Sequence, residues 1–237
     1  MNAMPKVLVI IPAYNESENI QKVINDLKKW APSMDYIIVN DCSKDSTLSV
    51  LQKADAKYLD LPINLGIGGG VQTGYLYAMK NEYDIAIQMD GDGQHNAKYL
   101  NALIEPIIEK RADFVIGSRY LQHEGFQSSF FRRIGIKFLS FLIKICTGIK
   151  IYDVTSGFRA VDKTLINLFA HEYAQDYPEP EAIVLAAQNN TKIMEVPVLM
   201  NERERGKSSI SGVRTIYYMI KVSLSIILLK CSLGRGK

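Results

Sequence analysis

Residues 84–95 read DIAIQMDGDGQH, an apolar run that ends in two aspartates, Asp90 and Asp92, separated by one glycine. A short apolar run bounded by glycine-rich turns is typical of a buried strand. Similar runs predict strands at 7–11, 36–40, 56–61 and 113–118. The segments between them have helical spacing, at 18–30, 46–54, 70–81 and 97–110. This alternation predicts an α/β fold, with a mostly parallel sheet and helices on both faces.

A polar sequence follows each predicted strand. Because ligands bind at the carboxyl ends of parallel strands, these sequences should meet at one edge of the sheet and form a site. They are PAYNE (12–16), NDCSKDST (40–47), NLGIGGG (64–70), DGDGQH (90–95) and SRY (118–120).

Asp90 and Asp92 are the predicted metal ligands. Two carboxylates one residue apart at a strand end can reach one hard cation, and Gln94 can add a further oxygen. The cation would be Mg²⁺ or Mn²⁺, bridging to substrate phosphates. A solvated acidic turn is the alternative. An EF-hand is excluded, because His95 and Asn101 occupy its glycine and glutamate positions.

The glycine run GIGGG (66–70) is predicted to open a helix and to let the backbone approach a phosphate or ribose. It is not a dinucleotide fingerprint, because Val71 stands where the last glycine would fall. Nor is GKS (206–208) a P-loop, since Asn201 stands where its first glycine would fall. These departures argue against a dehydrogenase and against an NTPase.

The overall composition is that of a globular protein, with 47% hydrophobic and 22% charged residues. A net charge of +3 without a long basic run gives no indication of nucleic-acid binding. The three cysteines, Cys42, Cys146 and Cys231, form no CxxC pair, so neither a disulfide framework nor a zinc site is expected.

Two segments have an amphipathic or apolar helical pattern. Residues 132–148 carry a narrow basic stripe and a wide apolar face, which predicts a helix in a membrane interface; burial in the core is the alternative. A second apolar helix at 215–230 is too short and interrupted to predict a membrane span. We therefore expect a catalytic domain at 1–210, with its interfacial helix at about 131–148, and a membrane-associating helix with a basic tail at 211–237.

Six motifs in this order resemble the family 2 glycosyltransferases of GT-A (Rossmann-like) fold, and most closely their dolichol-phosphate mannosyltransferase-like branch, which makes polyprenyl-phosphate sugars. The resemblance extends from about residue 6 to about residue 230. The motifs are IPAYNE (11–16), VNDCSKDST (39–47), NLGIGGGVQTG (64–74), DGDGQH (90–95), GSRY (117–120) and TSGFRA (155–160).

The resemblance implies two sets of binding residues around a catalytic group of Asp90, Asp92, Arg119 and Arg203. The nucleotide-sugar would contact Pro12, Tyr14, Glu16, Asp41, Asn64, Gly66, Asp90, Gly91 and Lys207. The acceptor phosphate would contact Ser118, Arg119, Arg133, Ser156 and Arg159. Asp41 would bind the base or ribose, although capping of the following helix is the alternative. Arg203 and Lys207 would close over the donor diphosphate, or form a solvated charge run.

The predicted reaction is inverting transfer from a nucleotide-sugar, with UDP-glucose or UDP-N-acetylglucosamine favoured, to undecaprenyl or dolichyl phosphate. A phosphate monoester is already anionic, so attack on the anomeric carbon needs no strong general base. Glu179 and Glu181 are candidates for sugar contacts or simply begin a helix. A soluble or polysaccharide acceptor, or a non-catalytic role in recruiting a membrane partner, is the alternative.

The predicted location is the cytoplasmic face of a membrane, with peripheral or shallow attachment. We expect a small membrane-protein partner or self-association to help hold the chain there.

Overall fold

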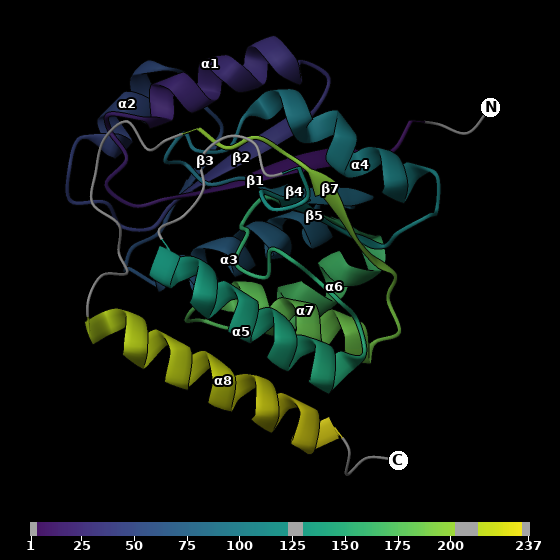
Figure 1. Ribbon diagram of the computed structural model, residues 1–237. Coiled ribbons are helices and arrows are strands. Elements are labelled where there is room, and N and C mark those ends of the chain that lie inside the picture. Colours follow the sequence, from purple (N-terminus) through teal and green to yellow (C-terminus); the bar gives the residue numbers. More distant parts are fainter. Residues whose placement is uncertain (1–3, 123–129, 202–212, 234–237) are drawn as a thin grey trace.

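The computed structural model describes residues 4–122, 130–201 and 213–233. Its seven-stranded sheet has the order β3-β2-β1-β4-β6-β5-β7 (Figure 1). The interior strand β1 is buried along its whole length, as expected for a continuous apolar run inside a parallel sheet. The strands are β1 (Val7–Ala13), β2 (Asp35–Asn40), β3 (Tyr58–Asp60), β4 (Ile85–Gln88), β5 (Phe114–Ser118), β6 (Arg159–Asp162) and β7 (Ile193–Pro197).

Helices cover both faces of the sheet, as predicted (Figure 1). One face packs against α1 (Ile20–Trp30), α2 (Thr47–Lys53) and α4 (Leu100–Ile108), with the short 3-10 turn η1 (Ala97–Tyr99) before α4. The other face packs against α3 (Gly66–Lys80), α6 (Lys163–His171), α7 (Pro178–Gln188) and α5 (Phe130–Thr147). In α1 the buried residues recur at helical spacing, at Ile20, Val23, Ile24 and Leu27, which fixes the face that it turns inward.

The strand β6 was not predicted. It runs antiparallel between β4 and β5. Because β5 is antiparallel to β6, its direction is again that of β4, and the carboxyl ends of β1 to β5 lie at one edge. The segment before β6, within TSGFRA, lies at this same edge.

The helix α5 and the final helix α8 (Val213–Leu233) lie side by side across the outside of α7 (Figure 1). Each has a face packed into the protein: α5 buries Ile136, Leu139 and Ile143, and α8 buries Tyr218, Val222 and Ile226. Their other faces expose large apolar side chains. The inner face of α5 fits the core interpretation of residues 132–148, and the membrane-interface interpretation of its outer face stays a prediction.

No helix within the described ranges is long and apolar enough to cross a membrane.

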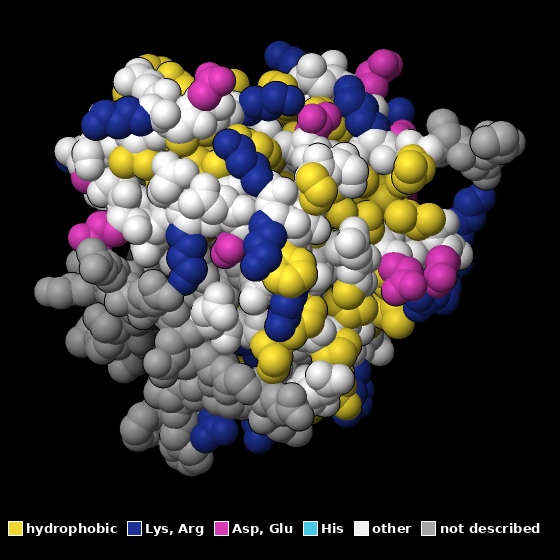
Figure 2. Space-filling model, turned by 90° about the horizontal axis from the view of Figure 1, so that it is seen from above, with side chains coloured by type: hydrophobic (Ala, Val, Ile, Leu, Met, Phe, Trp, Pro, Cys, Tyr) yellow, Lys and Arg dark blue, Asp and Glu magenta, His cyan; other side chains and the backbone are white. Residues whose placement is uncertain are grey.

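The face opposite α5 and α8 is formed by α1, α2 and α4 (Figure 2). There, lysines and arginines are interspersed with acidic side chains and apolar patches.

Candidate functional site

The turn after β4 is built around the buried side chain of His95, which is only 4% exposed. The backbone N–H of Asp90 donates to His95 Nδ1 at 2.9 Å, and His95 Nε2 lies 3.7 Å from Asp90 Oδ2. The ring stacks on Phe158 at 4.8 Å between centroids. Burial lowers the pKa of His95 to about 4, so the imidazole is neutral, with its proton on Nε2 toward the Asp90 carboxylate.

The Asp90 carboxylate packs directly on the backbone of Gly157, in the segment before β6. A Cβ on Gly157 would lie 2.9 Å from Asp90 Oδ2 and 3.0 Å from Oδ1. A side chain at position 157 would therefore displace Asp90. This contact explains why a glycine in the TSGFRA motif belongs to the same site as the aspartates.

The Asp92 side chain closes its own turn, and a second segment holds that turn in place. The backbone N–H of Gln94 donates to Asp92 Oδ1 at 3.0 Å. The backbone N–H of Asn201 donates to the Gln94 carbonyl at 2.9 Å, and Asn201 Nδ2 donates to the Gly93 carbonyl at 3.3 Å. The chain after β7 thus passes beside the aspartate pair.

The donor atoms of this turn suit a hard divalent cation, because Asp90, Asp92 and Gln94 offer only oxygen ligands from their carboxylates and side-chain amide carbonyl. The Asp90 side chain is 35% exposed, so the carboxylate can be reached from solvent. In the described part of the chain no three His, Cys, Asp or Glu side chains are grouped so that they could hold a metal. Mg²⁺ is usually bound in proteins by one or two carboxylates together with substrate phosphates.

Asp41 holds the beginning of α3. Its Oδ1 accepts the backbone N–H of Leu65 at 2.6 Å, and its Oδ2 accepts that of Gly66 at 2.9 Å. Asn64 Nδ2 donates to the Asp41 carbonyl at 2.9 Å. The alternative to nucleotide binding was that Asp41 caps the helix that follows it in the chain, which is α2. The helix that Asp41 caps is instead α3. In α2, Asp45 performs this task by accepting the backbone N–H of Thr47 at 2.9 Å.

The glycine run allows a close approach of protein backbone. A Cβ on Gly68 would lie 2.1 Å from the Ala174 carbonyl oxygen, and one on Gly74 would lie 2.1 Å from Ile10 Cγ2. The helix N-terminus, expected to receive a phosphate, already receives the Asp41 carboxylate at Gly66. Gly66 has φ +76°, a conformation that favours glycine.

The loops after β1 and β2 are joined by hydrogen bonds, which brings the predicted nucleotide residues together. The backbone N–H of Glu16 donates to Thr47 Oγ1 at 2.9 Å, and that of Asn15 donates to Ser43 Oγ at 3.0 Å. Pro12 is buried at the end of β1 beside Gly91, whose added Cβ would lie 3.0 Å from the Pro12 carbonyl oxygen. Tyr14 projects outward and is 42% exposed.

Arg119 lies at the same edge but is engaged with Asp153. Its Nε and Nη2 donate to the two carboxylate oxygens, each at 2.7 Å, and Nη2 also donates to Thr155 Oγ1 at 3.1 Å. Glu195 in β7 accepts the backbone N–H groups of Tyr152 and Asp153, both at 2.8 Å. Asp153 and Glu195 were not predicted, because a pairing across 34 and 42 positions leaves no local signal in a single sequence.

The remaining acceptor candidates differ in accessibility. Ser118 and Ser156 are each 1% exposed, and Ser156 Oγ donates to the Gly117 carbonyl at 2.7 Å. Arg159 is fully buried and donates to the carbonyls of Ser156 and Glu179. Arg133 lies exposed in the first turn of α5. Only Arg133 of this group presents a cation on the surface, while Arg203 and Lys207 lie outside the described residues.

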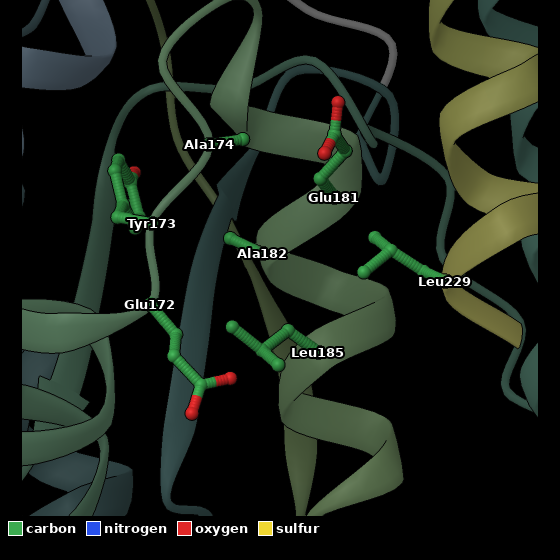
Figure 3. Close-up of a pocket in the computed structure, with 7 residues that line it drawn as sticks. All are labelled: Glu172, Tyr173, Ala174, Glu181, Ala182, Leu185 and Leu229. Carbon is green, nitrogen blue, oxygen red and sulfur yellow. The ribbon is translucent and has the colours of Figure 1, made fainter. Parts of the chain in front are cut away.

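A cavity of about 210 Å³ lies elsewhere, between residues 172–174, α7 and α8 (Figure 3). Of its lining residues, only Glu181 was a candidate in the sequence, for a sugar contact. Burial raises the pKa of Glu181, whose carboxylate is hydrogen-bonded to Ser225 of α8. Glu181 therefore faces α8, whereas Glu179 lies beside Arg159.

These features are those of a GT-A nucleotide-sugar transferase, and the comparisons with known proteins agree. The family model for glycosyl transferase family 2 matches residues 8–169, and the chain belongs to this family.

Two relatives align with this chain over most of their own length. UDP-N-acetylglucosamine–dolichyl-phosphate N-acetylglucosaminyltransferase of Methanococcus voltae is 28% identical, covering 94% of this chain and 98% of that protein. Undecaprenyl-phosphate mannosyltransferase of Micrococcus luteus is 31% identical, covering 87% and 88%. Among solved structures, glucosyl-3-phosphoglycerate synthase of Mycobacterium tuberculosis, in complex with Mn²⁺, UDP-glucose and phosphoglyceric acid, matches with TM-score 0.72 and 18% identity. The match covers 96% of this chain and 80% of that one, and it shows that the two proteins share a fold.

Proposed function

We propose that this protein transfers a sugar from a nucleotide-sugar to a polyprenyl phosphate, with inversion at the anomeric carbon. The relatives whose names include dolichyl phosphate and undecaprenyl phosphate support the acceptor class. The observation that carries the proposal is the position of Asp90 and Asp92. They follow β4 at the edge of the sheet where β5, the strand that precedes α5 in the chain, also ends.

The donor side is formed by the loops after β1, β2, β3 and β4. Asp90, Asp92 and Gln94 would hold Mg²⁺ or Mn²⁺, which would neutralise charge on the departing nucleoside diphosphate. Asp41 and Asn64 would contact the base and ribose, with Pro12, Tyr14, Glu16, Gly66 and Gly91 forming the walls. Lys207 and Arg203, which follow Asn201 in the sequence, would approach the diphosphate.

On the acceptor side, Arg133 is the residue proposed to meet the lipid phosphate directly. A phosphate monoester carries negative charge at neutral pH, and a guanidinium can bind it at two points. Arg119 would add positive potential from its place near Asp90, oriented by Asp153. Ser118, Ser156 and Arg159 would support this surface from within, since all three are buried.

The membrane surface is proposed to meet the exposed faces of α5 and α8. On α5 the exposed apolar residues are Ile134, Phe138, Phe141 and Ile145, and on α8 they are Tyr217, Ile220, Leu224, Ile227 and Leu228. Basic side chains on α5, including Lys137 and Lys144, suit anionic lipid headgroups. We place this contact at the cytoplasmic face, with a second copy or a small membrane protein strengthening it.

A transfer assay tests the function. The full chain is incubated with radiolabelled UDP- and GDP-sugars, undecaprenyl phosphate and Mn²⁺ or Mg²⁺, and the products are extracted into butanol. We expect label in the organic phase, its loss with Asp92→Asn, and no loss with the exposed control Asp55→Asn. Transfer to a water-soluble acceptor without lipid would contradict the proposal.

A sedimentation assay tests the membrane contact separately. Anionic vesicles should pellet the wild-type protein, whereas Phe138→Ser combined with Phe141→Ser should remain in the supernatant. Ile108→Ser removes an exposed side chain from α4 on the opposite side of the sheet and should pellet like the wild type. Equal sedimentation of all three proteins would refute the role of α5.

A further inference from the structure

The loop of residues 172–177, between α6 and α7, packs against two elements of the candidate site. The Tyr173 hydroxyl donates to Gln88 Oε1 at 3.1 Å, in the strand that leads into Asp90. The backbone N–H of Gly68 donates to the Gln175 carbonyl at 3.1 Å. The Gln175 side chain also donates to Gln72 Oε1 at 3.0 Å. The loop therefore connects β4 with the first turns of α3.

At its far end the loop contacts α8. The ring of Tyr177 meets that of Tyr218 edge to face, with centroids 4.6 Å apart and planes at 78°. Tyr218 is 7% exposed, so this contact lies inside the protein. Lys221, one turn further along α8, forms an ion pair with Asp176, but both side chains are exposed and the pair contributes little. The aromatic contact is thus the main connection between the loop and α8.

Tyr177 needs such a contact because of its backbone. Its φ of 52° and ψ of 56° are left-handed, a region that bulky residues with a Cβ rarely adopt. The strained residue precedes Pro178, with which α7 begins. A strained conformation of this kind persists only when surrounding contacts hold it.

Tyr177 is the residue before α7, and the first turn of that helix is connected to Asp90 through Arg159 and residues 156–157. The carbonyl of Glu179 accepts Arg159 Nη1 at 3.1 Å, and the same guanidinium donates from Nε to the Ser156 carbonyl at 3.0 Å. Ser156 precedes Gly157, whose backbone supports the Asp90 carboxylate. Each contact in this series joins residues that are buried or half-buried.

We propose that Tyr218 is a positioning residue for the nucleotide-sugar site, acting through Tyr177 and the loop before α7. The inner face of α8 would thus maintain the donor site, while its outer face meets the membrane. This inference rests on the proposed function for the identity of the donor. A helix expected from its sequence only to attach the protein to a membrane therefore has a second task.

The test compares variants of the full chain by calorimetric titration with UDP and GDP in the presence of Mn²⁺, and by transfer kinetics. Tyr218→Ala should weaken nucleoside diphosphate binding and raise the KM for the nucleotide-sugar by about tenfold, with a smaller change in kcat. Tyr218→Phe keeps the aromatic edge and should behave as the wild type. Tyr177→Gly in the Tyr218→Ala background should restore binding, because glycine adopts the left-handed conformation without strain.

Ile226→Ala is the matched structural control. Ile226 is fully buried on the same face of α8, two turns and roughly 12 Å beyond Tyr218. It should lower the melting temperature like Tyr218→Ala but leave nucleotide affinity unchanged. If Tyr218→Ala does not fold, Tyr218→Leu, which keeps the bulk without the aromatic edge, takes its place.

Two results would overturn the inference: equal nucleotide affinity in the wild type and Tyr218→Ala, or equal weakening by Ile226→Ala. The absence of rescue by Tyr177→Gly would contradict the route through Tyr177. A wild-type protein that binds nucleoside diphosphate but forms no lipid-linked product would instead refute the proposed function. The two failures are therefore distinguishable.

Discussion

Arg119 and Asp153 form a two-point ion pair inside the protein, with Nε–Oδ2 and Nη2–Oδ1 distances of 2.7 Å. The Asp153 side chain is fully buried and that of Arg119 is 9% exposed. The pair ties the end of β5 to the segment before β6. Both segments lie beside Asp90, so the pair fixes one wall of the site.

Asp153→Ala should therefore be strongly destabilising, because it leaves a buried guanidinium without its carboxylate. Loss of one partner from a buried pair costs about 3–5 kcal/mol. The double variant Arg119→Met with Asp153→Leu removes both charges and should be more stable than Asp153→Ala in urea unfolding. A double variant less stable than the single one would contradict this account.

Glu195 supplies a pH dependence whose sign follows from its burial. Burial raises the pKa of Glu195 above its ordinary value of 4.5. The folded protein thus favours the protonated form, so this contribution to stability is complete below the ordinary pKa and is lost as pH rises through the raised pKa.

The free energy of unfolding of the wild type, minus that of Glu195→Gln, should accordingly decrease as pH rises from about 4 and then level off. Glutamine cannot ionise, yet it keeps one acceptor for the backbone of Tyr152 or Asp153. Urea unfolding of both proteins from acid to neutral pH measures this difference. A difference that does not change with pH would refute the assignment.

Local pattern was sufficient to predict most of the sheet and the edge at which its polar loops meet. The five predicted strands, and the polar loops after them, could be recognised because each is a continuous segment. The strand β6 could not, because its four residues RAVD resemble the end of a loop and gain their place only by pairing with β4 and β5.

The roles of single side chains were harder to predict than the loops that carry them. The sequence identified TSGFRA as part of the site, but not that Arg159 points inward while Gly157 supports Asp90. The glycine run indicated close approach without revealing what approaches. Gly68 and Ala174 are distant in sequence, and single-sequence patterns contain no information on such a contact.

Gly68 provides a direct test of this close approach. A Cβ there would lie 2.1 Å from the Ala174 carbonyl oxygen, and backbone cannot move aside as a flexible side chain can. Gly68→Ala should therefore lower the free energy of unfolding by roughly 1–3 kcal/mol or more.

Gly70 is the matched control in the same helix, because its Cβ would meet only Pro12 Cβ, at 3.7 Å. Gly70→Ala should be neutral or stabilising by up to about 1 kcal/mol, since alanine favours helix. Thermal unfolding of the two variants measures the contrast. Equal effects of the two substitutions would show that the contact with Ala174 does not constrain position 68.

Asp41 is the residue for which two roles remain to be separated. Its carboxylate accepts the backbone N–H groups of Leu65 and Gly66, yet each oxygen has a further lone pair that a base N–H or a ribose hydroxyl can use. Asp41→Asn retains one acceptor and replaces the other by an amide group. It should lower stability by about 1 kcal/mol through the helix cap. It should also weaken nucleoside diphosphate binding by about tenfold, which corresponds to one hydrogen bond of about 1.4 kcal/mol.

Asp45→Asn separates the two roles, because Asp45 caps α2 through Thr47 and accepts the backbone N–H of Ser17 at 3.1 Å. It should reduce stability by a similar amount while leaving nucleotide affinity unchanged. Calorimetric titration with UDP and Mn²⁺, beside urea unfolding, measures both quantities for each variant. If Asp41→Asn matched Asp45→Asn in both, the role of Asp41 would be confined to holding α3. If only Asp41→Asn lost affinity, the carboxylate would both anchor the helix and bind the nucleotide.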